Sequence, residues 1–189
     1  MAIQELDNNT TQWHPTNQLK ELADRAGMNY IFGKTLDQNG GEYGNGILSK
    51  EKPIKVDYVD LFGDEPRKMI VAEFSNYIFC ATHFCYKSES EFDYKQKSAE
   101  RVNEYIANNY KSSNKTVYLG GDLNMANTNS DAFKILLEKW TIISVNTFTR
   151  VGQAERLDYI LLWEGNNPSY KILGSAVPKF NSLDINTVS

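Results

Sequence analysis

Several features that would settle the class of this 189-residue chain at once are missing. It holds only two cysteines and five prolines, and no stretch approaches the roughly 18 consecutive apolar residues of a membrane span. The formal net charge is −4, so there is no basic footprint of the kind that favours tight nucleic-acid binding. These absences argue against a membrane-spanning protein. They argue only slightly against a non-specific nuclease, because a bound metal ion can reverse the local charge of an acidic cleft.

The two cysteines, Cys80 and Cys85, are five residues apart in one apolar run. On a continuous strand an odd separation places side chains on opposite faces, so a disulfide between them is not expected. They also lack the spacing of a zinc site. We interpret both as packing residues, which leaves the redox compartment undetermined.

What the chain does contain is typical of a folded, strand-rich domain. Hydrophobic residues make up 41%, charged residues 23% and aromatic residues 12%. No repeat or linker interrupts the chain, so we expect residues 1–189 to form a single domain. Apolar periodicity predicts helices at 15–27, 91–110 and 131–140. Strands are predicted at 29–32, 46–49, 55–61, 68–74, 77–84, 116–119, 157–163 and 170–176. This order favours packed sheets with helices outside them.

The segment 117–124 ends an apolar run with two glycines and two polar residues. Gly120 and Gly121 would permit a sharp turn and the close approach of a ligand. In an extended chain Asp122 and Asn124 point the same way, so the carboxylate could orient a water and the amide could donate to a phosphoryl oxygen. The competing interpretation is an Asx turn at a strand end, which this segment alone would favour.

Two further acids adjoin apolar segments. Asp158 begins a predicted strand, where it would either cap a turn or pair with Arg156, or, as a functional residue, bind a metal or hold a histidine. Glu5 follows a short apolar segment and is either a solvated loop residue or an oxygen ligand for Mg²⁺ or Mn²⁺.

The sequence has two histidines. His83 ends an apolar run, where a hydrogen-bonded core histidine is the more common outcome and a catalytic one the alternative. His14 precedes Pro15, and we expect it to be exposed and structural.

In order and combination, these segments resemble the endonuclease/exonuclease/phosphatase superfamily, which has the DNase I-like fold. The matching elements are Gln4-Glu5, Gly44-Asn45-Gly46-Ile47-Leu48-Ser49, Thr82-His83-Phe84, Gly120-Gly121-Asp122-Leu123-Asn124 and Leu157-Asp158-Tyr159-Ile160. The resemblance covers nearly the whole chain, and its last two elements are the most specific. It implies an α+β fold: a four-layer αββα sandwich of two mixed, mainly antiparallel sheets.

The resemblance also implies catalytic roles. Glu5 is similar to the family's metal-binding glutamate, with Mg²⁺ or Mn²⁺ as cofactor. His83 is similar to the histidine that contacts the scissile phosphate, and Asp122 to the aspartate that orients the attacking water. Asn124 resembles the amide that stabilises the phosphoryl oxygen. Asp158 resembles the aspartate near the metal and the general-base histidine.

Two substrate-binding roles follow in the same way. Asn45 resembles a glycine-flanked asparagine beside the cleft, and Arg67 an arginine near the phosphate. The implied activity is metal-dependent hydrolysis of phosphate mono- or diesters, in which a cation neutralises charge and donors hold the oxygens. Nucleic acid, inositol phosphate and phospholipid headgroups are all open as substrates.

The ends of the chain depart from the family pattern. Family members begin with a strand that carries an asparagine and end with a Ser-Asp-His motif, whereas this chain starts almost at Glu5 and stops at Ser189. We therefore expect a truncated domain that lacks its first strand and last segment and is a poor catalyst by itself. Its exposed sheet edge would favour self-association. The compartment cannot be read from this N-terminus.

Two other hypotheses stay open. The first is a non-catalytic binding module of the same fold, which the retained acidic and amide residues argue against. The second is a generic α+β domain in which every motif is a turn or a cap.

Overall fold

The computed structural model describes residues 1–11, 15–146, 149, 154–166 and 170–176. His14 and Ser189 lie outside this part. The elements follow one another as β1 (Ala2–Asn8), α1 (Gln18–Ala26), β2 (Asn29–Gln38), β3 (Gly41–Ser49), β4 (Lys55–Leu61), β5 (Arg67–Glu73), β6 (Tyr77–His83), α2 (Tyr94–Tyr110), β7 (Thr116–Asp122), α3 (Asp131–Leu137), β8 (Trp140–Ile142) and β9 (Asp158–Trp163). None of these helices is long and apolar enough to cross a membrane.

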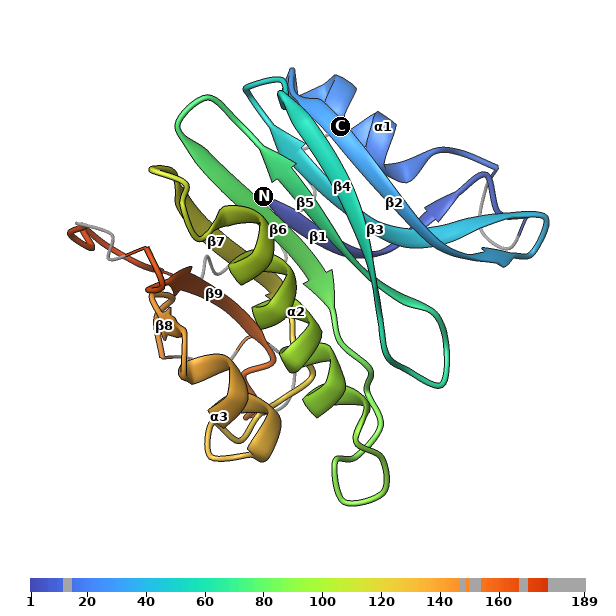
Figure 1. Ribbon diagram of the computed structural model, residues 1–189. Coiled ribbons are helices and arrows are strands. Elements are labelled where there is room, and N and C mark those ends of the chain that lie inside the picture. The colour runs from blue at the N-terminus through green and yellow to red at the C-terminus, as the bar shows by residue number, and fades with distance from the viewer. Residues whose placement is uncertain (12–14, 147–148, 150–153, 167–169, 177–189) are drawn as a thin grey trace.

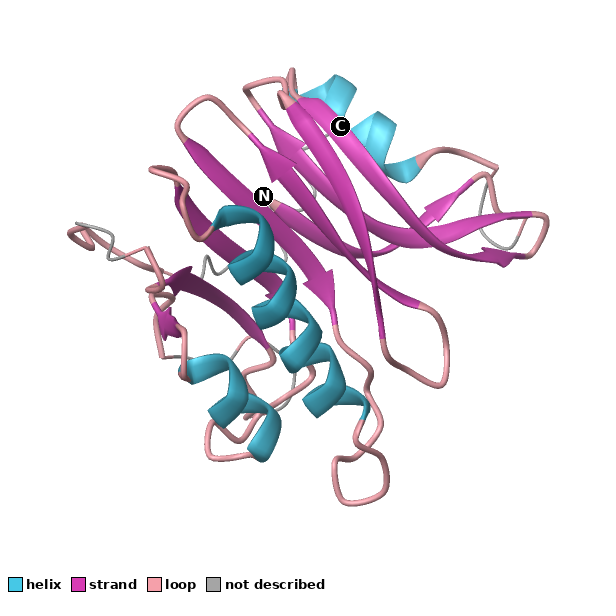
Figure 2. Cartoon of the chain, viewed as in Figure 1, coloured by secondary structure: helices cyan, strands magenta, loops and turns pink. Residues whose placement is uncertain are grey.

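The strands form two sheets that pack face to face (Figures 1 and 2). The smaller sheet has the order β1-β3-β2 and is antiparallel throughout. The larger has the order β4-β5-β6-β7-β9-β8, in which only β6 and β7 run parallel. The helix α2 joins these two strands, because a parallel pair needs a crossover connection.

Apolar side chains on both faces of each sheet produce four layers. On the outer face of the small sheet, α1 buries Leu19 and Ala23 against Leu6 and Leu48. Between the sheets lie Ile31, Ile47, Ile70, Ala72, Phe74 and Ala81. The helices α2 and α3 cover the outer face of the large sheet and form the largest apolar cluster with it. The expected α+β sandwich is therefore confirmed.

The strands predicted at 29–32 and 46–49 are much longer in the structure, because β2 and β3 pair as one hairpin from Asn29 and Ser49 to Gln38 and Gly41. The other differences from the predicted elements lie towards the two ends of the chain. Residues 2–8, which the prediction did not include, form β1 at one edge of the small sheet. The third helix ends at Leu137, and Trp140 begins β8, where its ring packs edge-to-face on Trp163 at 5.1 Å. The strand predicted at 170–176 is wrong, because these residues have no regular structure.

The strand β1 stands at one edge of the small sheet, where self-association is expected. Among the described strands, β1 pairs only with β3. Self-association through this edge stays a prediction.

Cys80 and Cys85 are buried and free, which agrees with their interpretation as packing residues.

Candidate active site

Three neighbouring strands of the large sheet carry a row of polar side chains at one end. His83 pairs with Asp122 in the parallel β6–β7 ladder, and Asp122 pairs with Asp158 in the antiparallel β7–β9 ladder. Partners across a ladder project to the same face, here the face that also carries Ala81 and looks toward the small sheet. Because like charges directly opposite each other destabilise a sheet, the two aspartates indicate function rather than stability.

Glu5 reaches the same place from the small sheet. The register of β1 against β3 shifts between Ile3 and Leu6, which marks a β-bulge. Within it Glu5 has a φ of 58°, in the left-handed region. A bulge re-aims a side chain, and positive φ is strained for a residue with a Cβ. The strained backbone therefore directs the carboxylate of Glu5 toward this site.

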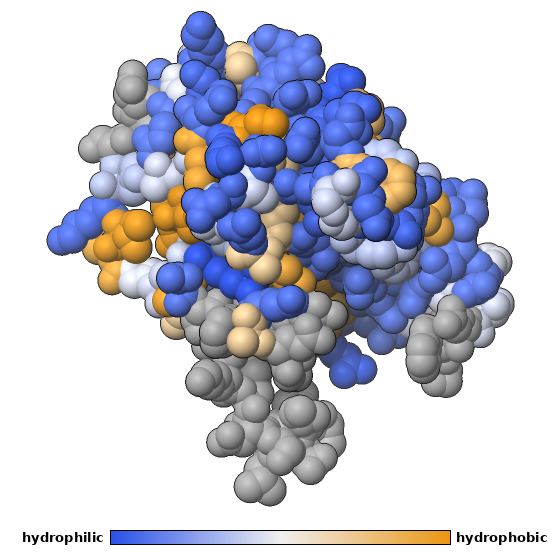
Figure 3. Space-filling model, turned by 90° about the horizontal axis from the view of Figure 1, so that it is seen from below, coloured by the Kyte–Doolittle hydropathy of each residue, from blue (hydrophilic) through white to orange (hydrophobic). Residues whose placement is uncertain are grey.

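Glu5, Asp122 and Asp158 line a pocket of about 500 Å³, whereas the buried His83 lies behind Asp122 and is not part of its lining. Its lining consists of Glu5, Tyr86, Asp122, Asn124, Ala126, Glu155, Leu157 and Asp158. Four of these are acidic and none is cationic. This end of the sandwich, where β6 and β7 terminate, faces the viewer in Figure 3 and is mainly hydrophilic. The pocket would repel a phosphate unless a cation neutralised part of its charge.

The paired glycines have a different role from the one predicted. Gly120 and Gly121 lie within β7 and not in a turn. A Cβ on Gly121 would stand 2.0 Å from the carbonyl oxygen of Thr82 and 3.0 Å from the Gln4 amide, and Gly121 has a φ of 143°. The absence of side chains lets β1 and β6 approach β7 closely, which brings Glu5 toward the row of polar residues.

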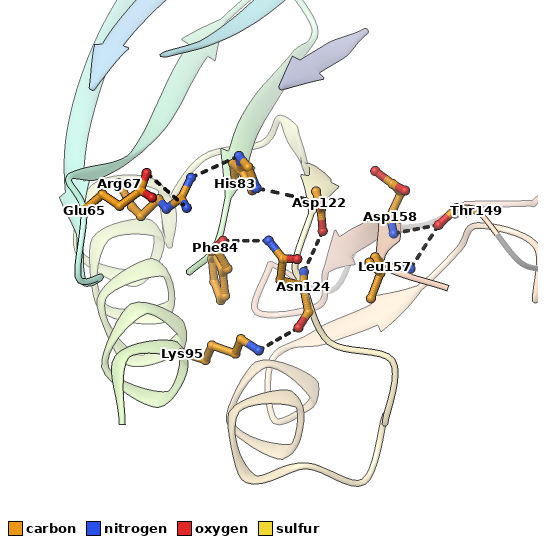
Figure 4. A network of polar contacts seen from close by, with 10 residues as sticks. All are labelled: Glu65, Arg67, His83, Phe84, Lys95, Asp122, Asn124, Thr149, Leu157 and Asp158. Carbon is orange, nitrogen blue, oxygen red and sulfur yellow. Dashed lines mark hydrogen bonds and ion pairs between the residues drawn. The ribbon is translucent and has the colours of Figure 1, made fainter. Parts of the chain in front are cut away.

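Asp122 and Asn124 form a compact turn at the end of β7 (Figure 4). The backbone N–H of Asn124 donates to Asp122 Oδ1 at 2.7 Å, and Asn124 has a φ of 50°. The predicted Asx turn is thus present, and both residues also line the pocket. The side-chain amide of Asn124 donates to the carbonyl of Phe84 at 2.9 Å. One amide N–H remains to serve a ligand.

Sequence reasoning missed Lys95, which supports this turn. Lys95 lies on α2, is only 6% exposed, and donates from Nζ to the carbonyl oxygen of Asn124 at 2.7 Å. Burial lowers the pKa of the ammonium, while Glu89, Cys85 and Asp122 act in the opposite direction. The sequence did carry a signal for it, because residue 95 stands four positions before Ala99 and seven before Val102, on the buried face of α2. A lysine on that apolar stripe is unusual and could have been singled out.

Arg67 contacts the Nδ1 side of the His83 ring, and Asp122 lies on the Nε2 side. Arg67 Nη1 lies 3.2 Å from His83 Nδ1, and both side chains are buried. A guanidinium can only donate, so Nδ1 accepts and the histidine carries its proton on Nε2. Burial, reinforced by the guanidinium charge, lowers the pKa of His83 to about 4. The ring is therefore neutral near pH 7.

The pKa of Asp122 is shifted upward, in the direction opposite to that of His83. Burial raises its pKa to about 6, with Asp158 and Glu5 adding to the rise and the hydrogen bond from Asn124 opposing it. His83 Nε2 lies 3.8 Å from Asp122 Oδ2, too far for a hydrogen bond. Because the imidazole is neutral, this contact is not an ion pair at neutral pH.

Of the remaining predicted residues, Asp158 lines the pocket, whereas Asn45 and Arg67 do not. Asn45 is buried and donates to the carbonyl of Lys68 at 3.1 Å, outside the pocket lining. Arg67 contacts Glu65 at 3.5 Å and His83 at 3.2 Å, and its charge also opposes the rise in the pKa of Asp122. Asp158 is anchored by its backbone N–H, which donates to Thr149 Oγ1 at 3.1 Å.

Arg156 does not provide the pairing considered for Asp158. Its guanidinium donates to the carbonyl of Ser144 at 2.9 Å and lies 4.3 Å from the ring centroid of Tyr159.

The carboxylate oxygens of the pocket suit a hard cation that keeps part of its water shell. Among the described residues, no group of three or more His, Cys, Asp and Glu side chains converges as a metal cage. Mg²⁺ does not require one, because it keeps several waters and binds through one or two carboxylates. Glu5, Asp122 and Asp158 lie near enough for the charges of the other two to raise the pKa of Asp122. A cation among them would relieve that repulsion.

Comparison with known proteins gives a consistent result. The profile of the endonuclease/exonuclease/phosphatase family matches residues 1–169. No curated protein matches the chain by sequence. Among solved structures, a mannosyl-6-phosphatase of Bacteroides thetaiotaomicron superposes with a TM-score of 0.61 at 15% identity, covering 78% of this chain and 67% of that one.

Two further structures are similar. A protein of the same family from Leptotrichia buccalis has a TM-score of 0.61 at 14% identity, covering 85% of this chain and 73% of that one. The catalytic domain of human Nocturnin, solved with a bound sulfate anion, has a TM-score of 0.56 at 13% identity, covering 77% and 64%. The chain thus spans about two thirds of the length of these structures, and likeness at this identity shows the fold alone.

Proposed function

Because the chain belongs to the endonuclease/exonuclease/phosphatase family, we propose that its acidic pocket is the catalytic site of a divalent-metal-dependent hydrolase of phosphate mono- or diesters. One observation supports this most strongly: the row of His83, Asp122 and Asp158 across three strands, which Glu5 faces from the other sheet. No packing argument accounts for two aspartates at the end of one sheet with a glutamate of the other sheet facing them.

Glu5 is the proposed ligand of Mg²⁺ or Mn²⁺, and Asp158 adds negative charge close by. When bound, the cation supplies neutralisation of the phosphoryl oxygens. The strained bulge at Glu5 supports this assignment, because a positive φ at a glutamate has no structural benefit of its own.

Asp122 is proposed to orient the water that attacks phosphorus. With a pKa near 6, it is mostly ionised at pH 7 and yet more basic than an ordinary aspartate. Such a carboxylate can accept the proton of the water as the new oxygen–phosphorus bond forms and the ester oxygen departs. The Asx turn fixes the carboxylate, since Oδ1 already accepts from Asn124.

His83 and Asn124 are proposed to hold the phosphoryl oxygens. The tautomer set by Arg67 leaves the N–H of His83 on Nε2, on the side of Asp122. A neutral donor stabilises the charge that develops in the transition state without first trapping a phosphate. The second amide N–H of Asn124 is available in the same way. Lys95 is proposed to act through Asn124 and Arg67 through His83. Direct contact of Arg67 or Asn45 with the substrate stays a prediction.

The metal assignment is tested by calorimetry. The chain is titrated with Mg²⁺ and Mn²⁺ beside Glu5→Ala, Asp158→Ala and the exposed, distant control Glu104→Ala. We expect the two pocket variants to bind more weakly and the control to bind like the parent. A folded parent that binds neither cation, or binding that both pocket variants leave unchanged, would refute the assignment.

Catalysis is tested with a panel of phosphate mono- and diesters. Hydrolysis that needs the divalent cation, and that Asp122→Asn removes while cation binding persists, is the expected result. Hydrolysis that survives both Asp122→Asn and His83→Ala would place the chemistry elsewhere.

A further inference from the structure

Tyr86 is the one aromatic side chain among the described residues that line the acidic pocket. Its side chain is 53% exposed, far more than an aromatic ring needs if its purpose is packing. The residue stands three positions after His83, the last residue of β6. Two positions before Tyr86, the carbonyl of Phe84 accepts from the Asn124 amide, which ties this segment to the proposed catalytic turn.

The neighbours of Tyr86 restrain the ring itself. The ammonium of Lys87 lies 4.8 Å from the ring centroid, and a hydrogen bond with Tyr86 raises the pKa of Lys87. Lys87 also lies 3.6 Å from a carboxylate oxygen of Asp64. The other oxygen of that carboxylate accepts from the buried Cys85 thiol at 3.2 Å. A ring held in this way loses little conformational freedom when a ligand stacks on it.

The pocket lining holds two kinds of side chain. Glu5, Asp122 and Asp158 are acidic, whereas Tyr86 and Leu157 are largely apolar. The apolar side chains offer nothing to a phosphate or a cation, so they suit an uncharged portion of the substrate.

We propose that Tyr86 is a specificity residue whose exposed ring stacks on a flat ring that the substrate carries next to its phosphate. This inference rests on the proposed phosphoesterase function. The shared chemistry is a planar or flat-faced ring, which a nucleobase or a sugar can provide, because an aromatic face accepts either without directional hydrogen bonds. The pocket lining has no cationic side chain among the described residues, which favours a small ester with one phosphate over a polyanion.

Binding of phosphonates tests the idea, because a phosphonate is not turned over. The ligands are the phosphonate analogues of adenosine monophosphate, mannose 6-phosphate and glycerol 3-phosphate, titrated by calorimetry in the presence of Mg²⁺. The proteins are the parent chain, Tyr86→Ala, Tyr86→Phe and the control Tyr30→Ala, which removes a 41%-exposed tyrosine of β2 outside the pocket.

We expect the parent to bind at least one ring-bearing analogue roughly tenfold more tightly than the glycerol analogue. Tyr86→Ala should abolish that preference and leave binding of the glycerol analogue unchanged, while Tyr86→Phe and Tyr30→Ala retain it. A preference for the adenosine analogue identifies a nucleobase as the stacked ring, and one for the mannose analogue identifies a sugar.

Three results would overturn the inference: equal affinity of the parent for all three analogues, a preference that survives Tyr86→Ala, or an equal loss for all three analogues in that variant. Failure of the underlying function has a different signature. In that case none of the phosphonates binds, or binding is insensitive to Glu5→Ala.

Discussion

Replacing Asp122 with asparagine should stabilise the metal-free protein at pH 8, although it removes a residue that we propose to be catalytic. The Asp122 carboxyl is only 22% exposed. Its pKa is raised to about 6, chiefly by burial and further by Asp158 and Glu5. An amide at this position has no charge to bury and can still accept the hydrogen bond from the Asn124 backbone.

The magnitude follows from the pKa difference between the folded and the unfolded chain. A rise from 3.8 to about 6 is roughly two units, and each unit corresponds to about 1.4 kcal/mol. Because the folded pKa is the higher one, the folded state holds this proton more tightly. The corresponding stability is complete below pH ~4 and is lost as the pH rises through 6. At pH 8 the carboxylate therefore costs the protein about 3 kcal/mol.

Urea unfolding in the presence of EDTA at pH 4.5, 6 and 8 measures this effect. The D122N variant should be about 3 kcal/mol more stable than the parent at pH 8, nearly as much more stable at pH 6, and about 1 kcal/mol more stable at pH 4.5, because the gain builds up between the unfolded pKa of 3.8 and the folded pKa of about 6. Its melting temperature at pH 8 should rise by roughly 4–12 °C. The exposed-acid variant E104Q controls for the loss of one negative charge and should show no such pH dependence.

A D122N protein no more stable than the parent at pH 8 would refute the reasoning. So would a gain of equal size at all three pH values, because it would come from packing and not from the ionisation of this carboxyl. Adding Mg²⁺ at pH 8 should reduce the difference, since a cation in the pocket stabilises the carboxylate of the parent.

Three further outcomes are expected. R67M should raise the pKa of His83, measured by NMR titration, because the guanidinium is one of the two causes that lower it to about 4; the loss of stability as pH falls from about 6.5 towards 4 should shrink accordingly. K95M should lower the free energy of unfolding by about 1–3 kcal/mol, since it removes the donor to a partly buried carbonyl oxygen; K95R, which keeps a donor, should lose less in the same denaturation experiment. G121A should cost at least about 2 kcal/mol in thermal unfolding, because a Cβ there meets backbone at 2.0 Å, whereas G174A, where nothing lies within 4 Å, should stay within about 0.5 kcal/mol.

Local signals in the sequence were sufficient for most elements. Apolar periodicity located α2 and the strands β4 to β7 within a few residues, because each element buries one face against the core. The same reasoning failed at residues 170–176, where an apolar run finds no partner strand. An apolar run predicts a strand only if the tertiary fold offers an edge to pair with.

The candidate site, too, could be predicted only in part from the sequence. The order of Glu5, His83, Asp122, Asn124 and Asp158 along the chain was enough to indicate the family, and the family profile confirms that membership. Their individual roles stay predictions. The interpretation of Asp122 and Asn124 as either an Asx turn or a ligand-facing pair was too narrow, because the structure combines both.

The sequence by itself determined the fold class, through the order of its motifs and their resemblance to the family. It also placed His83, Asp122 and Asp158 at strand ends, because apolar runs are read from residues close along the chain. Only the tertiary structure decided the rest. The bulge that turns Glu5 toward the pocket depends on the register between β1 and β3. The tautomer of His83 depends on Arg67, which is 16 positions away along the chain. The support from Lys95 depends on how α2 packs against the end of β7. Each of these is a contact between distant segments, and no local pattern specifies the register or packing that brings such segments together.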